Sequence, residues 1–243
     1  MDEKKLKLMC YVGGILTIAF YLIFLFIAWG LFPNPASPLD HWLSDFGRFE
    51  IPADGGPVWR YIDGSWKEFT EITPTIPSRP NPAAIIYDLG CILAGGSMFL
   101  FFTGFLAYID KEDKASKLLT YALMVIGYLG GIFLILVGIF TEDGIFPGII
   151  APSVNAIHHL ATMIFFIFLI GIKVLSGLWA WKHDLNRFIS FYAWITIIFD
   201  IILVVTDNNF SVIEWTSVLL SLGTVAIVAI GLYLKDKPLK LNK

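Results

Sequence analysis

Six long apolar runs constrain this chain more than any other feature of its sequence. They cover residues 8–32, 83–109, 118–140, 158–181, 188–206 and 212–234. Each run has about 19–27 residues, which as a helix rising ~1.5 Å per residue is enough to cross ~30 Å of hydrocarbon. Only 15% of the residues are charged, against about 25% in soluble domains. The sequence therefore predicts an all-α membrane protein in which residues 1–243 form a single six-transmembrane-helix bundle.

The distribution of positive charge predicts how this bundle is oriented. Lysine and arginine occur before the first run, between the second and third, between the fourth and fifth, and after the sixth. The short connections at 141–157 and 207–211 carry neither residue. Cytoplasmic loops of membrane proteins are enriched in Lys and Arg, so both termini are expected in the cytoplasm. The sequence contains no basic cluster of the kind that would indicate nucleic acid as a partner, so none is expected.

The long loop at 33–82 is then expected outside the cytoplasm, as a cap within the single membrane domain. Its segment VWRYIDGSWKEFTEI alternates in polarity and contains an Asp63-Gly64 pair. Asp-Gly is a favoured two-residue turn between antiparallel strands, so the loop is predicted to contain a small β-hairpin. The hairpin has two interpretations, a structural cover over helix ends or a lid over a site.

Acidic and imidazole side chains gather near the outer ends of the predicted helices. Asp88 lies six residues after Pro82, and Asp200 lies six residues before Thr206. Both are therefore expected ~9 Å below the outer ends of their helices. His158 and His159 open the fourth run, and the first of them is expected at the helix mouth and the second facing inward. Ionisable residues inside membrane spans are costly and are candidates for function, so these four residues are the candidate catalytic group.

Further polar residues in the outer connections are candidate ligand-binding residues. They are Ser44, Asp45, Glu142, Asp143, Asp207 and Glu214. The inner half of the membrane has no comparable group. Lys173 is an exception there, and its long side chain is expected to reach the inner interface.

Several chemistries fit such a cluster, and the sequence leaves them open. His158, His159 and Asp88 are candidate ligands for a divalent metal such as zinc. A histidine oriented by a carboxylate can instead act as a general base. A hydrogen-bonded network that fixes helix register, or a polar ligand or ion pathway without chemistry, would use the same residue types. The sequence contains no HExxH, CxxC or GxSxG motif to choose among them.

Two stretches resemble a known family. HWLSDFG follows the first run, and PNPAAIIYDLGCILAGG opens the second. Together with VGIF and HHLATMIFF further on, they resemble the prokaryotic domain-of-unknown-function 998 family. That family is similar to the eukaryotic Frag/DRAM/Sfk group, which includes the damage-regulated autophagy modulator. The resemblance implies a six-helix bundle with cytoplasmic termini, and it points to Ser44, Asp45, Gly47, Asp88, Gly95 and one of His158 and His159.

The eukaryotic relatives are associated with lipid remodelling, lipid asymmetry and autophagy, so the resemblance also implies lipid handling. We therefore expect membrane lipids as partners, with a headgroup entering a polar pocket from the outer leaflet. The protein would either bind the lipid or act on it as a metal-dependent or His/Asp-dependent hydrolase or transferase. The alternatives are a small ion- or proton-coupled transporter and a non-catalytic scaffold or sensor. The ligand, the metal and the oligomeric state stay open.

Overall fold

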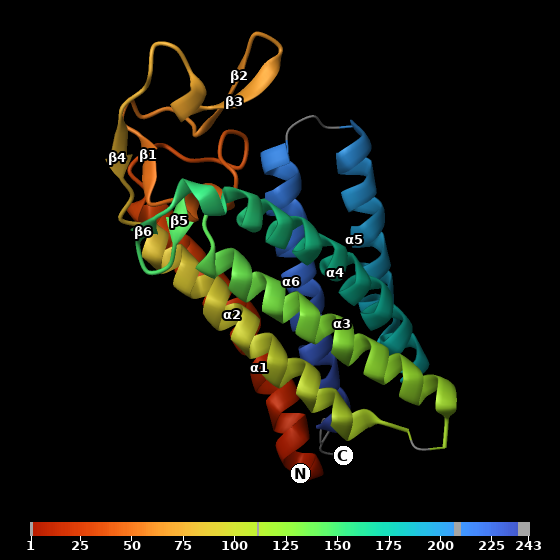
Figure 1. Cartoon of the computed structure of the whole chain (residues 1–243). Coiled ribbons are helices and arrows are strands. Elements are labelled where there is room, and N and C mark those ends of the chain that lie inside the picture. The colour runs from red at the N-terminus through yellow and green to blue at the C-terminus, as the bar shows by residue number, and fades with distance from the viewer. Residues whose placement is uncertain (1, 111, 207–209, 238–243) are drawn as a thin grey trace, which may run out of the picture.

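The computed structural model describes residues 2–110, 112–206 and 210–237, and six long helices dominate this part of the chain (Figure 1). The helices are α1 (Glu3–Leu31), α2 (Ala84–Gly104), α3 (Lys114–Ile139), α4 (Asn155–Lys182), α5 (Arg187–Thr206) and α6 (Phe210–Asp236). A 3-10 turn, Phe105–Tyr108, continues α2. All six predicted helices are therefore present, and their ends differ from the apolar runs by at most about five residues.

Five helical segments of the described chain are long and apolar enough to cross a membrane. They are Glu3–Leu31, Ala84–Tyr108, Lys114–Ile139, Pro152–Lys182 and Ser211–Asp236. Helix α5 is apolar but is not among these five. Segments of this length and composition indicate an integral membrane protein built as a helical bundle.

Neighbouring helices in the sequence are neighbours in the bundle. Helix α1 packs against α2 and α6, α2 against α3, and α3 against α4. Helix α4 also contacts α5 and α6. The start of α1 and the end of α6 lie together at one end of the bundle (Figure 1), where Lys7 Nζ is 3.4 Å from Asp236 Oδ1. The hydroxyls of Tyr11 and Tyr108 donate to the same Asp236 carboxylate.

The strands gather at the opposite end of the bundle (Figure 1), which we call the strand-bearing end. Strands β2 (Trp59–Ile62) and β3 (Ser65–Glu68) form the predicted hairpin, with Asp63 and Gly64 at positive φ in its turn. Strand β1 (Glu50–Pro52) pairs with β4 (Ser78–Pro80), and β5 (Gly144–Ile145) pairs with β6 (Ile149–Ile150). The last two pairs were not predicted, because strands of two or three residues are too short to show an alternating pattern.

Helices α1 and α2 approach each other closely at a glycine in each helix. A Cβ added at Gly13 would lie 2.3 Å from Phe101 N, and one added at Gly104 would lie 2.5 Å from Cys10 N. These neighbours are backbone atoms, so they cannot move aside without shifting a helix. Small residues at contact points allow membrane helices to pack closely in this way.

We expect Gly104→Ala to destabilise the protein by about 1–3 kcal/mol, the usual cost of overpacking a tight contact. Its matched control is Gly96→Ala on the same helix, where an added Cβ would meet no atom within 4 Å. Alanine favours a helix over glycine by up to ~1 kcal/mol, so the control should be neutral or stabilising. Thermal unfolding of the purified variants in detergent measures both. Equal effects would show that the α1–α2 contact is not close.

Candidate functional site

A buried arginine fastens the long loop to the connection between α3 and α4. Arg48 Nη1 lies 2.5 Å from Glu142 Oε2, and Arg48 Nη2 lies 2.6 Å from Glu68 Oε1. The hydroxyl of Ser44 donates to Glu142 Oε1 at 3.0 Å. We call Ser44, Arg48, Glu68 and Glu142 the Arg48 cluster. Burial disfavours the charged form of Glu142, but the positive charges of Arg48 and the nearby histidines outweigh burial and lower the pKa of this carboxyl.

Asp143, the next residue, binds the backbone of the same loop. Its Oδ1 accepts a hydrogen bond from Phe49 N at 3.0 Å, and its Oδ2 accepts one from Glu50 N at 2.8 Å. The hydroxyl of Thr141 also donates to Oδ1, at 3.1 Å. Because Glu50 begins β1, Asp143 fixes the point where the loop enters that strand. Both predicted ligand-binding acids of this connection are therefore engaged by the protein itself.

The LSDFG motif forms a 3-10 helix, Ser44–Gly47, that packs on α2. Gly47 faces the predicted catalytic residue Asp88, and a Cβ at this glycine would lie 2.4 Å from Asp88 Oδ1. Asp88 Oδ2 is buried and has no hydrogen-bond partner in the described part of the chain. The motif therefore sits directly over Asp88, which explains why a residue without a side chain stands at position 47.

Two other acids hold the start of this 3-10 helix. Asp45 Oδ2 accepts from Trp42 N at 2.9 Å, and Glu214 Oε2 on α6 accepts from Leu43 N at 2.6 Å. Burial and then the negative charge of Glu142 raise the pKa of Asp45 well above its usual range, against the opposing effect of Arg48. The uncharged form of Asp45 is therefore favoured over a wider pH range than for an exposed aspartate.

The two adjacent histidines lie in different surroundings. His159 was expected to face inward, but His158 is the buried one. His158 is only 3% exposed, and its Nδ1 donates to the carbonyl of Phe140 at 2.6 Å. Its Nε2 lies 3.4 Å from the hydroxyl of Thr162. His159 is exposed. Neighbouring residues of a helix point about 100° apart. Because the His158 side chain points to the carbonyl of Phe140 at the end of α3, the side chain of His159 points in another direction.

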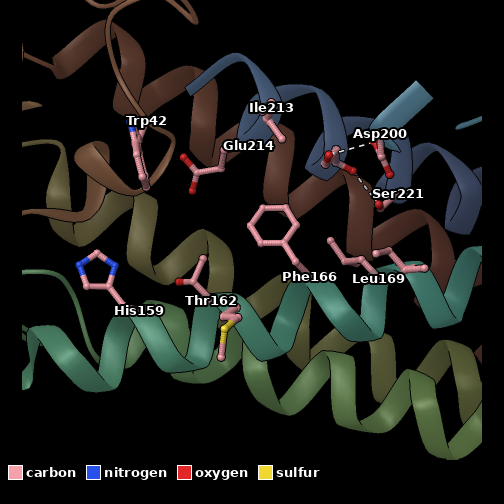
Figure 2. A pocket seen from close by; sticks show the side chains of 12 residues that line it. Trp42, His159, Thr162, Phe166, Leu169, Asp200, Ile213, Glu214 and Ser221 are labelled. Atoms are coloured by element: carbon pink, nitrogen blue, oxygen red, sulfur yellow. Dashed lines mark hydrogen bonds between the residues drawn. The ribbon is translucent and has the colours of Figure 1, made fainter. Parts of the chain in front are cut away.

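A cleft of about 340 Å³ lies between α4 and α6, and we call it the α4–α6 cleft. Figure 2 shows His159, Thr162, Trp42 and Glu214 towards one end, Phe166 in the middle, and Asp200 and Ser221 towards the other end. The wall between these ends is apolar. The lining residues are Trp42, His159, Thr162, Met163, Phe166, Leu169, Ile170, Asp200, Ile213, Glu214, Ser217 and Ser221.

A buried ion pair lies at the end of this cleft where Asp200 and Ser221 are found. Lys173 Nζ is 2.6 Å from Asp200 Oδ2, and the hydroxyl of Ser217 donates to Asp200 Oδ1 at 2.9 Å. Lys173 is fully buried, so the expectation that it reaches the inner interface is wrong. Its side chain pairs instead with an acid of the neighbouring helix, because charged groups inside a membrane bundle are stabilised by a partner of opposite sign.

The predicted catalytic residues do not form one constellation. His159 and Asp200 line the α4–α6 cleft together with Glu214, while Asp88 lies under Gly47 and His158 binds the end of α3. Asp207 lies outside the described residues. No group of three or more His, Cys, Asp or Glu side chains that could hold a metal is found among residues 2–110, 112–206 and 210–237. The three candidate metal ligands thus have no common centre there.

Three residues that shape the site were not predicted. Arg48 follows LSDFG directly, and its position among many loop acids was a usable signal. The sequence indicates an interfacial position for Lys173 and gives no sign of its partner Asp200. Trp42 lines the α4–α6 cleft, and its aromatic side chain beside His41 carried no signal that would separate it from other loop tryptophans.

We expect Glu142→Gln to lower the free energy of unfolding by about 3–5 kcal/mol, because it leaves the charge of Arg48 underpaired in a buried position. The control is Asp54→Asn, which breaks the Arg60–Asp54 pair, where the Asp54 side chain is 43% exposed. Exposed pairs contribute about 0–1 kcal/mol. Unfolding in detergent, followed by tryptophan fluorescence, compares the two. Similar losses from both variants would contradict a central role for the Arg48 cluster.

Comparison with known proteins adds no assignment. No protein-family model matches the chain, and neither the curated proteins nor the solved structures gave a significant match.

Proposed function

We propose that all six helices span the membrane and that both termini are cytoplasmic. The lysines at the start of α1 and at the end of α6 lie on the side of the bundle opposite the strands (Figure 1). Lys114 and Lys117 lie at the start of α3, and Lys182 and Arg187 flank the connection between α4 and α5, as basic residues do at cytoplasmic helix ends. On this topology the strand-bearing end faces away from the cytoplasm, and the α4–α6 cleft opens at the depth of the outer leaflet.

Cysteine labelling tests this topology without removing native cysteines, since Cys10 and Cys91 are buried. Ser65→Cys, in the exposed hairpin, should react with a membrane-impermeant maleimide in intact cells. Lys117→Cys, exposed near the start of α3, should react only after permeabilisation. The reverse pattern would invert the topology, and reaction of both in intact cells would exclude the six-span arrangement.

We propose that the α4–α6 cleft binds a membrane lipid or a similar amphiphile. The observation that carries this proposal is the mixed lining of the cleft. Its middle is apolar, whereas the end nearest the strands presents the imidazole of His159 and the carboxylate of Glu214 (Figure 2). An acyl chain would contact the apolar wall, and the polar part of the molecule would remain near these two groups.

The cleft is accessible from the side of the bundle. Met163 and Ile170 line it, and they are 57% and 46% exposed. In a membrane, side chains exposed on the flank of a bundle face lipid. A volume of about 340 Å³ lies near the lower limit of ~300–1,000 Å³ for small-molecule sites. The cleft therefore accommodates part of one acyl chain and its attachment point, while the rest of the lipid stays in the bilayer.

Binding is favoured over the alternatives by the contacts around the cleft. A hydrolase or transferase would have to use His159 with Glu214, because Asp88 and His158 lie elsewhere. A carrier would have to separate Asp200 from Lys173, to which it is joined at 2.6 Å. Lipid binding needs neither a further catalytic group nor the breaking of this pair. The resemblance to the domain-of-unknown-function 998 family stays a prediction that agrees with it.

A photoactivatable phospholipid in liposomes tests the cleft, and crosslinks should concentrate on segments 159–170 and 213–221. Met163→Trp should reduce their yield several-fold, because the larger ring fills the cleft. Leu160→Trp is the matched control, since Leu160 is 53% exposed on the same helix but does not line the cleft. An even spread of crosslinks over all helices, or equal yields from both variants, would contradict a specific site.

A further inference from the structure

A second cavity lies at the strand-bearing end, and we call it the hairpin cavity. It has a volume of about 230 Å³ and is formed by the β2–β3 hairpin, the loop after α1 and the start of α6. Trp42 lines both this cavity and the α4–α6 cleft. The two sites therefore share one lining residue. The lining residues are Leu39, Asp40, Trp42, Pro57, Trp59, Arg60, Tyr61, Trp66 and Ser211.

Four aromatic residues line the hairpin cavity. Trp42 and Trp59 stack with ring centroids 5.9 Å apart and planes 26° apart. Tyr61 and Trp66, which are paired across the hairpin, meet edge to face at 5.5 Å. The faces of aromatic rings carry partial negative charge and attract cations, and cages of such rings recognise quaternary ammonium groups.

The charged groups around the cavity favour the same kind of ligand. Arg60 is already paired, because its Nη2 lies 2.7 Å from Asp54 Oδ1 and its Nε donates to the carbonyl of Pro57. Asp40 accepts a hydrogen bond from the neutral hydroxyl of Ser37 at 2.8 Å. The positive charge of Arg60 is therefore offset by Asp54, whereas the hydrogen bond from Ser37 brings no positive charge to Asp40.

We infer that the hairpin cavity binds the ammonium-bearing headgroup of a phospholipid whose chain occupies the α4–α6 cleft. This inference rests on the proposed lipid binding, but it adds a distinct site and a distinct chemistry. The hairpin then serves as the recognition element for the headgroup. Trp42, shared by both cavities, stands where the headgroup joins the chain.

Phosphocholine, the soluble headgroup alone, tests this site on the full chain in nanodiscs of phosphatidylglycerol, which has no ammonium group. Saturation-transfer NMR should show transfer from protein to the trimethylammonium protons. The uncharged isostere 3,3-dimethylbutanol should show none, because it has the shape of choline without its charge. Equal transfer to both compounds, or transfer to methyl glucoside instead of phosphocholine, would overturn the inference in favour of an apolar or a sugar site.

Two variants test whether phosphocholine binds in the hairpin cavity, and a third is the control. Asp40→Asn and Trp66→Leu should each weaken phosphocholine binding about threefold to tenfold, the range expected for losing one charge or one aromatic face. Glu71→Gln is the control, because it removes an exposed carboxylate that does not line the cavity and keeps a side chain suited to its capping position. Equal weakening by all three variants would assign the signal to general surface charge and overturn the inference.

The outcome separates this inference from the proposed function. Failure of phosphocholine to bind, combined with lipid crosslinks in the α4–α6 cleft, would overturn the headgroup site and leave lipid binding intact. Phosphocholine binding without crosslinks in the cleft would leave an ammonium site at the hairpin, but it would overturn both lipid binding in the cleft and a phospholipid as the occupant of the hairpin cavity. Absence of both would overturn both.

Discussion

Arg48 carries its charge into a position where its side chain is 3% exposed, and a charge is tolerated there only if partners surround it. Its two partners come from different parts of the chain, Glu68 from the long loop and Glu142 from the α3–α4 connection. The ion pairs therefore determine where the loop sits on the bundle. The loop then places the LSDFG helix over Asp88 and brings Trp42 to the α4–α6 cleft.

The acids within the helices also differ in the partners that surround them. The sequence leads us to regard Asp88 and Asp200 as equivalent, since both lie about 9 Å from an outer helix end. Their surroundings differ completely. Asp200 is paired with Lys173 and bound by Ser217, whereas Asp88 has an oxygen without a partner among the described residues and lies against a glycine. Depth along a helix gives no information about which neighbour a side chain meets.

This difference shows which parts of the structure were predictable. Helix positions follow from local hydropathy, and the hairpin follows from a local Asp-Gly turn, so both were predicted correctly. The Arg48 cluster joins residues about a hundred positions apart, and the Lys173–Asp200 pair joins two helices. Such contacts depend on helix rotation and packing, which hydropathy does not specify. For the same reason the orientation of His158 and His159 was predicted the wrong way round.

Trp42 connects the structural and the proposed functional parts of the molecule. Its backbone N–H donates a hydrogen bond to the carboxylate of Asp45, and its side chain lines both the α4–α6 cleft and the hairpin cavity. Leu43, beside it, is bound by Glu214, which itself lines the cleft. A ligand that contacts Glu214 or Trp42 therefore contacts groups that also position the LSDFG helix. Occupancy of the cleft and stability of the strand-bearing end should then be linked, because anything that binds only the folded arrangement stabilises it.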